Sequence, residues 1–501
     1  MNYLYYSDEL KYPENNSDFS PSESYPEYPF KKYVSSEKNY VYEAIRLMFK
    51  NLNLDIDNFG SPDWNPLGKW IKPGQRVVLK PNFVMHKNGS ANPDDLDSLV
   101  THPSIIRCIL DYCYIALKGK GTIIVGDAPV KDCDFKLLMQ LGNYDTIEKF
   151  YKKNTKSFKV NFLDFRGPEE EGGQYKSSGK GITVNLGSKS LFFDDKEKNK
   201  KYRIPNYNYK KVVAHHSGEI QEYMINSEVL EADVIINLPK PKTHRKNGYT
   251  GALKNFVGIN YSKEYLPHHT EGDIKSGGDE YNTFSVFKYI SSKLRLYIDI
   301  NRTIINNGQK SNNFRFRKKL HRYMWKLYIF CLKLDKYLLR ILNQPCENYV
   351  IEGTWYKNDT LWRTVLDLNY IINYAKLNGS LSDLKQRTII HIGDMIISGE
   401  GEGPMSPEPK KQNMLLFSDN AVEFDCILTK IMGFDYKSFK GLINAIDSEV
   451  LFNKKYSEIT VQSNYIDWNK MLSSINFLGT VTSFIPAKGW RGHVEIKDGN
   501  L

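Results

Sequence analysis

The chain has 501 residues, of which 25% are charged and 41% hydrophobic, and a formal net charge of +11. This composition is ordinary for a soluble globular protein, and no run of residues reaches the length of a transmembrane helix. The six cysteines contain no CxxC pair, which argues against an iron–sulfur cluster or a disulfide framework. The first residues lack the basic and apolar regions of a secretion signal, so we expect a cytoplasmic protein.

The first third of the chain predicts a tail followed by a strand–helix–strand unit. Residues 1–34 are rich in Tyr, Ser, Pro, Asp and Glu and predict a flexible N-terminal arm. Helical spacing of apolar residues predicts a helix over 37–52 with a serine cap. Strands over 76–79 and 122–125 flank a helix that begins at Pro103, with His102 as its cap. This order predicts a right-handed parallel crossover in the first part of an α/β core, residues 35–150.

The rest of the chain alternates between core segments and insertions. We predict an α/β fold with a mostly parallel sheet and flanking helices, interrupted by an antiparallel insertion and a helical insertion. The antiparallel insertion, 151–231, is expected to hold strands around 159–165, 183–186 and 211–213. The later segments are a core strand with a basic site loop (232–274), a helical basic and aromatic insertion (275–350), the second part of the core (351–450) and a C-terminal extension (451–501).

One stretch of the helical insertion has two interpretations. Residues 314–342 read FRFRKKLHRYMWKLYIFCLKLDKYLLRIL, which is helical, basic and aromatic, and apolar on nearly all sides. A buried helical hairpin is the default prediction. A peripheral membrane helix is the alternative, because lysines and arginines accompany the aromatic residues.

The segment over 232–258, ADVIINLPKPKTHRKNGYTGALKNFVG, predicts the functional site. An apolar strand ends at two prolines, which cannot continue a regular ladder. A cationic loop follows, and parallel strands deliver such loops to the carboxyl edge of the sheet, where α/β proteins bind ligands. We therefore predict an anion site with His244 and Lys254 as catalytic residues, since the ordinary pKa of histidine suits acid–base work near neutrality.

Other expected strand ends carry residues suited to the same cleft. The predicted ligand-binding set is Lys80, Asn82, Asp127, Lys240, Lys242, Asn255 and Asp419. A glycine-rich acidic loop, GDMIISGEGEGP, adds Asp394, Glu400 and Glu402 as candidate ligands for a divalent metal. Because these strands are expected to end at the same carboxyl edge of the sheet, we predict a cleft in which lysines face carboxylates around an anionic ligand. The sequence identifies no cofactor beyond this candidate metal.

Several of these segments together resemble a known family. LKPNFV at 79–84, THPSIIRCIL at 101–110, IIVGDAPV at 123–130, the 232–259 stretch, IGDMIISGEGEGPMSPEP at 392–409 and LLFSDNAVEFDCILTKIMGF at 415–434 resemble the bacterial and archaeal family named domain of unknown function 362. Some members of that family carry ferredoxin-type cysteines, which this chain lacks. The resemblance implies an α/β fold and no established reaction.

The 232–259 stretch is also similar, more distantly, to the nickel-pincer lactate racemases. That resemblance implies a histidine and a lysine ten residues apart beside the nickel cofactor, and His244 and Lys254 have this spacing. It also implies a later histidine, which would correspond to His268 or His269. The chain departs from those enzymes where their first catalytic histidine is expected, because it has Gly126-Asp127-Ala128 there. The departure argues against a nickel-pincer nucleotide.

We therefore expect binding of a phosphorylated or carboxylated small molecule, with epimerase- or racemase-like proton transfer as the leading reaction. The alternative is a non-catalytic, membrane-peripheral binding or scaffold protein that uses residues 314–342. Nucleic-acid binding ranks third, because no recognised module is present and the basic residues form no contiguous stripe in the sequence.

Overall fold

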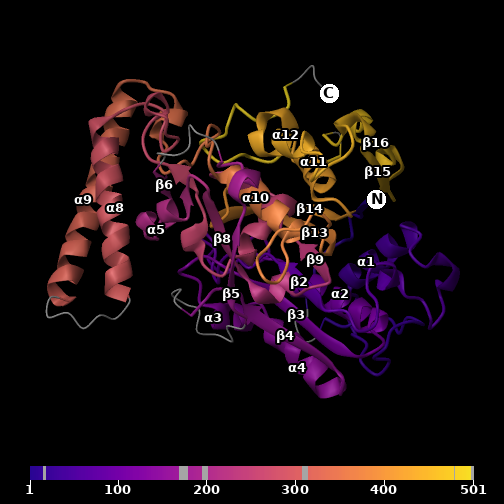
Figure 1. Ribbon diagram of the computed structural model, residues 1–501. Helices are drawn as coiled ribbons and strands as arrows, with labels where there is room; N and C mark the ends of the chain where they lie inside the picture. The colour runs from indigo at the N-terminus through magenta and orange to yellow at the C-terminus, as the bar shows by residue number, and fades with distance from the viewer. Residues whose placement is uncertain (15–18, 169–178, 194–200, 307–313, 479, 498–501) are drawn as a thin grey trace.

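The computed structural model describes residues 1–14, 19–168, 179–193, 201–306, 314–478 and 480–497. One large sheet crosses the molecule, and two long helices stand at its side (Figure 1). In spatial order its main path consists of β16 (Lys470–Met471), β15 (Thr460–Ser463), β1 (Asn2–Tyr6), β14 (Ser406–Ser418), β13 (Thr388–Glu402), β9 (Val234–Leu238), β2 (Val77–Pro81), β3 (Gly121–Asp127) and β4 (Phe158–Asp164). The five strands from β13 to β4 are parallel, which confirms the predicted α/β fold.

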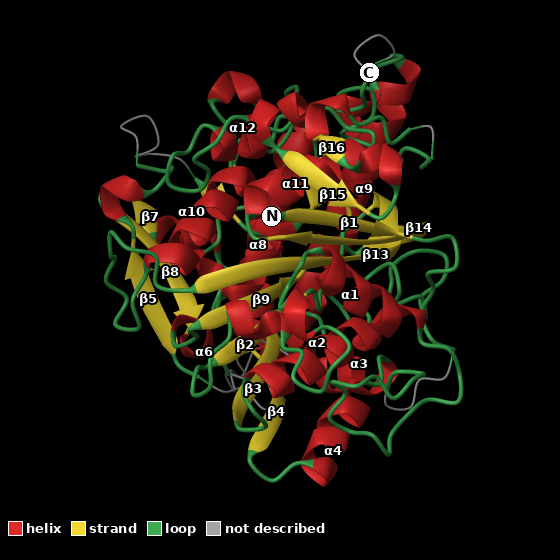
Figure 2. Cartoon of the chain, turned by 90° about the vertical axis from the view of Figure 1, so that its right-hand side faces the viewer, coloured by secondary structure: helices red, strands yellow, loops and turns green. Residues whose placement is uncertain are grey.

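The central strands are buried on both faces, and alternate side chains enter different apolar clusters. Val77 and Leu79 pack on one side of the sheet, and Val78 packs on the other. The first cluster includes residues of α1 (Tyr40–Asn51), α2 (Pro103–Ala116), α3 (Phe135–Leu141) and α4 (Tyr144–Asn154). The opposite clusters include residues of α6 (Ser227–Leu230), α7 (Ala252–Asn255), α10 (Leu361–Tyr374), α11 (Ala421–Ile431) and α12 (Lys440–Ile446). Figure 2 shows this layered arrangement.

The predicted strand–helix–strand unit is present as β2, α2 and β3. The Nδ1 atom of His102 accepts a hydrogen bond from the backbone N–H of Ser104 at 3.2 Å, and Pro103 begins the helix. The cap role predicted for His102 is thus confirmed. The earlier helix, α1, begins later than predicted, because Asn39 rather than a serine accepts the bond from its first turn.

The N-terminal segment is not the flexible arm that its composition predicts. Strand β1 lies between β14 and β15, antiparallel to the first and parallel to the second. Beyond it, Leu10, Tyr12, Phe19 and Tyr28 are buried in the core. Aromatic burial and sheet hydrogen bonds therefore outweigh the polar composition of this segment. Residues 15–18 lie outside the described part of the chain.

The segment predicted as an antiparallel insertion is divided between two sheets. Strand β4 extends the parallel sheet beside β3, so the strand expected around 159–165 belongs to the core. A small antiparallel sheet follows, made of β5 (Gly181–Asn185), β8 (Ile220–Asn226) and β7 (His216–Ser217). The strand expected over 211–213 is wrong: these residues lie in helix α5 (Tyr209–Ala214), which the Asn208 side chain caps. Residues 169–178 and 194–200 lie outside the described ranges.

The helical insertion forms two antiparallel helices, α8 (Val286–Asn306) and α9 (Phe314–Ile341), which project beside the core (Figure 1). Leu294, Ile298, Tyr328 and Cys331 form a small apolar cluster of buried residues here. The two helices confirm the predicted hairpin. The prediction that the hairpin is buried is wrong, since one face of α9 is exposed. Residues 307–313 of this insertion are outside the described ranges.

The described helices include none that combines the length and the apolar character required for a membrane crossing.

The glycine-rich acidic stretch is a strand rather than the predicted loop. Residues 393–402 belong to β13, which pairs with β14 along most of its length. Helix α11 follows β14 and is capped by Asn420, whose Oδ1 accepts from two backbone N–H groups. The remaining short pairing joins β6 (Tyr202–Arg203) to β12 (His269–Thr270).

Candidate functional site

The candidate site begins where β9 ends. Pro239 and Pro241 separate β9 from a small hairpin, β10 (Lys242–His244) and β11 (Gly248–Thr250). The carbonyl oxygens of the two prolines accept hydrogen bonds from the N–H groups of Asp394 and Gly399, at 3.0 and 3.1 Å. The chain thus leaves the main ladder at the prolines, as predicted, but the expected basic loop is a hairpin attached to β13.

An ion pair at the ends of β2 and β3 forms one wall. Lys80 Nζ lies 2.8 Å from Asp127 Oδ1, and both side chains are buried. The Asp127 carboxylate also accepts from the N–H groups of Phe83 and Ala128, at 2.6 and 2.8 Å. A Cβ atom at Gly258 would lie 1.7 Å from Asp127 Oδ1, so only glycine lets the chain pass this close to the pair.

A chain of amide contacts joins three strand ends to helix α7. Lys242 Nζ donates to Asn82 Oδ1 at 2.7 Å, and Asn82 Nδ2 donates to Asn255 Oδ1 at 2.9 Å. Asn255 Nδ2 in turn donates to Asn237 Oδ1 at 2.7 Å. Burial, followed by the charge of Lys240, holds the pKa of Lys242 well below its usual range. The predicted residues Asn82, Lys242 and Asn255 are therefore in direct contact.

Lys254, on helix α7, is a cation of the site that has no direct partner among the described residues. Burial, followed by the charge of Lys263, lowers the pKa of Lys254 to about 7. Asp127 opposes this shift, and Lys80 and Lys246 add to it. Its Nζ makes no hydrogen bond or ion pair with any residue that the structure describes. An amine in this environment exchanges its proton near neutral pH and attracts an anion when protonated.

Two histidines with complementary ring orientations lie within the electrostatic reach of Lys254. His244 Nδ1 accepts from the N–H groups of Lys246 and Asn247, at 3.0 and 3.1 Å, which leaves the proton of the neutral ring on Nε2. His268 Nδ1 lies 2.9 Å from the carbonyl oxygen of Leu266, which places its proton on Nδ1. Burial lowers the pKa of both rings well below the usual range, with Lys254 next in effect on His244 and Lys246 on His268. One neutral imidazole can therefore donate a proton while the other accepts one.

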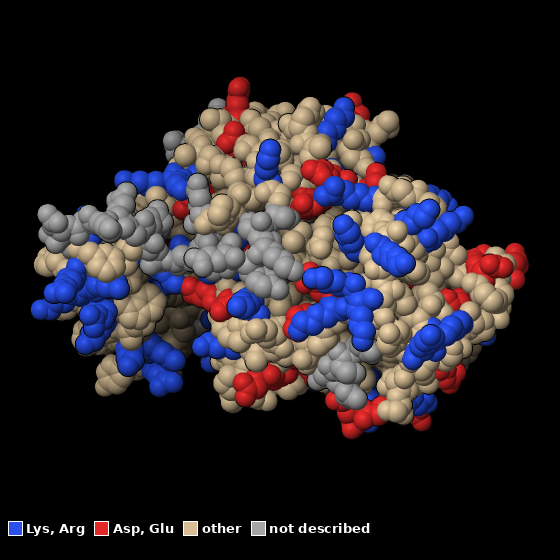
Figure 3. Space-filling view, turned by 90° about the horizontal axis from the view of Figure 1, so that it is seen from below, with Lys and Arg blue, Asp and Glu red and all other residues tan. Residues whose placement is uncertain are grey.

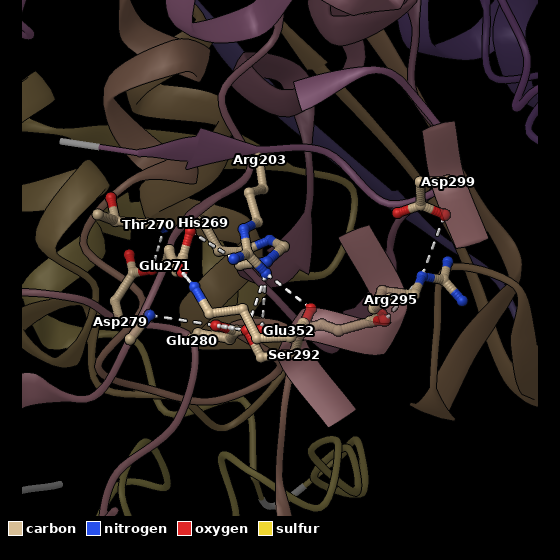
Figure 4. Close-up of polar contacts among 12 residues, drawn as sticks. Arg203, His269, Thr270, Glu271, Asp279, Glu280, Ser292, Arg295, Asp299 and Glu352 are labelled. Atoms are coloured by element: carbon tan, nitrogen blue, oxygen red, sulfur yellow. Dashed lines mark hydrogen bonds and ion pairs between the residues drawn. The ribbon is translucent and has the colours of Figure 1, made fainter. Parts of the chain in front are cut away.

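The rim of the site meets the root of the helical insertion. Lys246 Nζ donates to the Glu352 carbonyl oxygen and lies 3.3 Å from His269 Nδ1, and burial lowers its pKa to about 8. The Glu352 carboxylate lies 3.3 Å from Arg295 on α8 (Figure 4). Beside it, Arg203 reaches Glu280 and Ser292, at 3.3 and 2.9 Å (Figure 4). These contacts fix the insertion against the site.

Two of the predicted ligand-binding residues lie away from this cluster. Lys240 is fully buried, with its Nζ 3.1 Å from Asp394 Oδ2 and 2.6 Å from the Tyr12 hydroxyl. Asp419 lies at the other edge of the sheet, because β14 is antiparallel to β13 and ends beside His391. Its Oδ1 accepts from the amino group of Met1 at 2.6 Å. Its expected place in the cleft is therefore wrong.

The three predicted metal ligands are not brought together. Asp394 is paired with Lys240, Glu400 lies 3.3 Å from Lys410, and Glu402 accepts from the N–H of Lys488 at 2.9 Å. Among the described residues no group of three or more His, Cys, Asp or Glu side chains is arranged to hold a metal ion. The expectation of a loop misplaced these carboxylates, since a strand rises by about 3.3 Å per residue and so carries Asp394 away from Glu400 and Glu402.

Sequence reasoning missed one residue that supports the site from below. Asp425, on α11, accepts from the N–H of Ala252 at 2.6 Å and from the hydroxyl of Tyr249 at 3.1 Å, and so fixes the start of helix α7. Burial raises the pKa of Asp425 to about 7. The only sequence signal was a lone aspartate within an apolar helical run, which signifies a buried partner without identifying it.

Comparison with known proteins gives a partial match to one family and no activity. Residues 189–430 match the family described as domain of unknown function (DUF362), which confirms the predicted resemblance over this range. A crystal structure of a protein from Thermotoga maritima matches 44% of this chain and 38% of its own length, with 14% identity and a TM-score of 0.21. That likeness is too weak to carry an argument. No curated protein matches the chain, and the similarity to nickel-pincer lactate racemases stays a prediction.

Proposed function

We propose that the protein binds a phosphorylated or carboxylated small molecule beside Lys254 and moves a proton on it. The observation that carries the proposal is Lys254 itself, whose Nζ has no partner among the described residues and whose pKa is lowered to about 7. Lys246 and the partly exposed Arg245 add positive charge nearby. An anion would relieve the repulsion among these cations and add charge-assisted hydrogen bonds.

The buried lysines serve this site indirectly. Lys80 and Lys242 are fully enclosed and already bonded to Asp127 and Asn82. In the proposed function they hold the strand ends together, whereas Lys254, Lys246 and Asn82 contact the ligand. This assignment revises the expectation that all of the lysines hold the anion directly.

The proton-transfer part rests on the two imidazoles. His244 presents Nε2–H and His268 presents the lone pair of Nε2, so a C–H bond between them could lose a proton to one ring and regain one from the other. Protonated Lys254 would stabilise the negative charge that develops on a neighbouring carboxylate or carbonyl oxygen. This arrangement supports an isomerase-like reaction.

A ligand screen with matched variants tests the binding step. Phosphate, pyrophosphate and malonate should raise the melting temperature of the protein, because they bind only the folded state, and salt should weaken the effect. Lys254→Met should abolish the shift, and Lys376→Met, at an exposed position, should retain it. An equal shift with uncharged glycerol, or an unchanged response of Lys254→Met, would show that no anion site exists here.

A deuterium-exchange assay tests the chemical step separately. Carboxylated and phosphorylated compounds with an acidic C–H bond, incubated with the protein in heavy water, should gain deuterium detected by mass spectrometry. His244→Gln and His268→Gln should each lose this exchange while keeping the anion-induced thermal shift. Binding without exchange in the parent protein would leave an anion-binding protein and refute the isomerase-like reaction.

A further inference from the structure

The outer face of helix α9 carries a regular stripe that the site does not use. Four aromatic residues recur every seventh position, and each keeps between 60% and 65% of its accessible surface: Phe316, Tyr323, Phe330 and Tyr337. Four exposed cations recur at the same interval, each three residues after an aromatic one: Lys319, Lys326, Lys333 and Arg340. Positions three, four and seven residues apart lie on one side of a helix, so aromatic and cationic groups alternate along one line. We call this set the α9 stripe.

The stripe is not an uncovered part of the protein core. The inner face of α9 is already packed, since Tyr328 and Cys331 meet Leu294 and Ile298 of α8. Helix α8 is fixed to the body of the protein through Arg295, whose Nε lies 3.3 Å from Glu352 (Figure 4). The hairpin thus presents the stripe outward on a rigid support, over a length of about 36 Å at 1.5 Å per residue.

Basic residues greatly outnumber acidic residues in α9. Its sequence holds nine lysines and arginines and a single acidic residue, Asp335, which is buried against Ser285. Seen from below, blue side chains gather on the side of the molecule where the hairpin projects (Figure 3). A surface of this kind is complementary to an anionic partner.

The apolar residues at the root of the hairpin distinguish between anionic partners. Ser285 Oγ donates to Asp335 Oδ1 at 2.5 Å, which places the start of α8 beside the last turns of α9. Phe284 and Val286, on one side, and Ile341 and Leu342, on the other, each expose between 59% and 64% of their surface. Exposed apolar side chains gain free energy in the acyl region of a bilayer, which the charged backbone of a nucleic acid does not offer.

We propose that the α9 stripe and the apolar residues beside it dock the protein on an anionic lipid surface, with α9 lying in the plane of the interface. Aromatic rings settle at the level of lipid headgroups, and lysines and arginines contact the anionic phosphates. The partner is therefore a membrane leaflet rich in anionic lipid.

Vesicle flotation of the full chain tests this docking. The protein should float with vesicles of phosphatidylcholine and phosphatidylglycerol at low salt and remain unbound with phosphatidylcholine alone. Lys319→Glu, Lys326→Glu and Lys333→Glu together should lower the partition coefficient by at least about tenfold, since each basic residue near an anionic surface contributes about a factor of five. The matched control reverses three exposed lysines of other segments, Lys136, Lys376 and Lys385, and should bind like the parent.

A second variant separates lipid insertion from simple attraction of charge. Replacing the four aromatic residues of the stripe by serine keeps every positive charge and should still lower the partition coefficient, with circular dichroism unchanged. Equal binding of this variant, absence of vesicle binding by the parent, or binding to an oligonucleotide in place of vesicles would each overturn the proposal.

Discussion

The cations of the candidate site and those of helix α9 show how burial decides what a lysine can do. Lys80, at the site, and Lys240, away from it, are enclosed and each is paired with an aspartate, whereas Lys254 is half-buried and its pKa is lowered. On α9, Lys326 and Lys333 extend into solvent. The same side chain thus occurs as a structural ion, as an amine with a lowered pKa and as a surface charge. Substitutions in each of the three environments test this difference.

The largest effect should come from the enclosed pair of Lys240 and Asp394. Asp394→Asn leaves the Lys240 ammonium without its counter-charge, and we expect the free energy of unfolding to fall by about 3–5 kcal/mol. Urea denaturation measures this loss. Asp145→Asn is the control, because its pair with Lys149 is exposed and should contribute at most about 1 kcal/mol. Equal losses in the two variants would contradict the structural role of Lys240.

A smaller effect of opposite sign is expected at Lys254. Its pKa is about 7 in the folded chain and 10.5 in the unfolded one, so the unfolded state holds the extra proton between these values. Stability from this residue is therefore lowest below pH 7 and rises with pH, by up to about 1.4 kcal/mol per pH unit. Lys254→Met should stabilise the protein by about 1–3 kcal/mol at pH 6.

The Lys254 prediction is checked by denaturation at several pH values. The advantage of Lys254→Met over the parent should shrink from pH 6 toward pH 10, while Lys376→Met should show no such trend. A constant difference across this range would mean that Lys254 has an ordinary pKa in the folded protein.

The smallest effect is expected on α9. Lys326→Gln and Lys333→Gln should change the free energy of unfolding by no more than about 0.5 kcal/mol, because both side chains are exposed. Tyr328→Ala on the inner face should cost about 3 kcal/mol by the same measurement. A large loss in the lysine variants would show that the stripe supports the fold rather than an interface.

The sequence predicted the parts of the fold that depend on local patterns. The strand over 234–238 and the crossover around α2 were predicted because apolar runs, prolines and caps act over a few residues. The meeting of Lys80, Asn82, Asp127 and Lys254 followed from the shared carboxyl edge of parallel strands. The predicted division of the chain into core and insertion segments differs from the structure at the points described above. The rest of that division stays a prediction.

Features that depend on long-range pairing could not be predicted. The strand character of 393–402 comes from β14 on one side and from β10 at Gly399 on the other, and its glycines signalled a loop. The direction of β14, which removes Asp419 from the cleft, is fixed by its hairpin with β13. The sequence contains the seven-residue interval between the aromatic residues of the α9 stripe. Which side of the helix is exposed, however, depends on the contact of α9 with α8.

The position of β1 has a consequence for how the protein is made on the ribosome. This strand is translated long before its partners β14 and β15. At 5–20 residues per second, about 20 to 80 s separate the synthesis of Tyr6 from that of Ser418. Tyr12 contacts Lys240 and Asp394, and Asp394 is synthesised almost as long after Tyr12. The nascent chain must therefore keep an aromatic segment shielded until β14 and β15 have been made, and β1 joins the sheet after both of them.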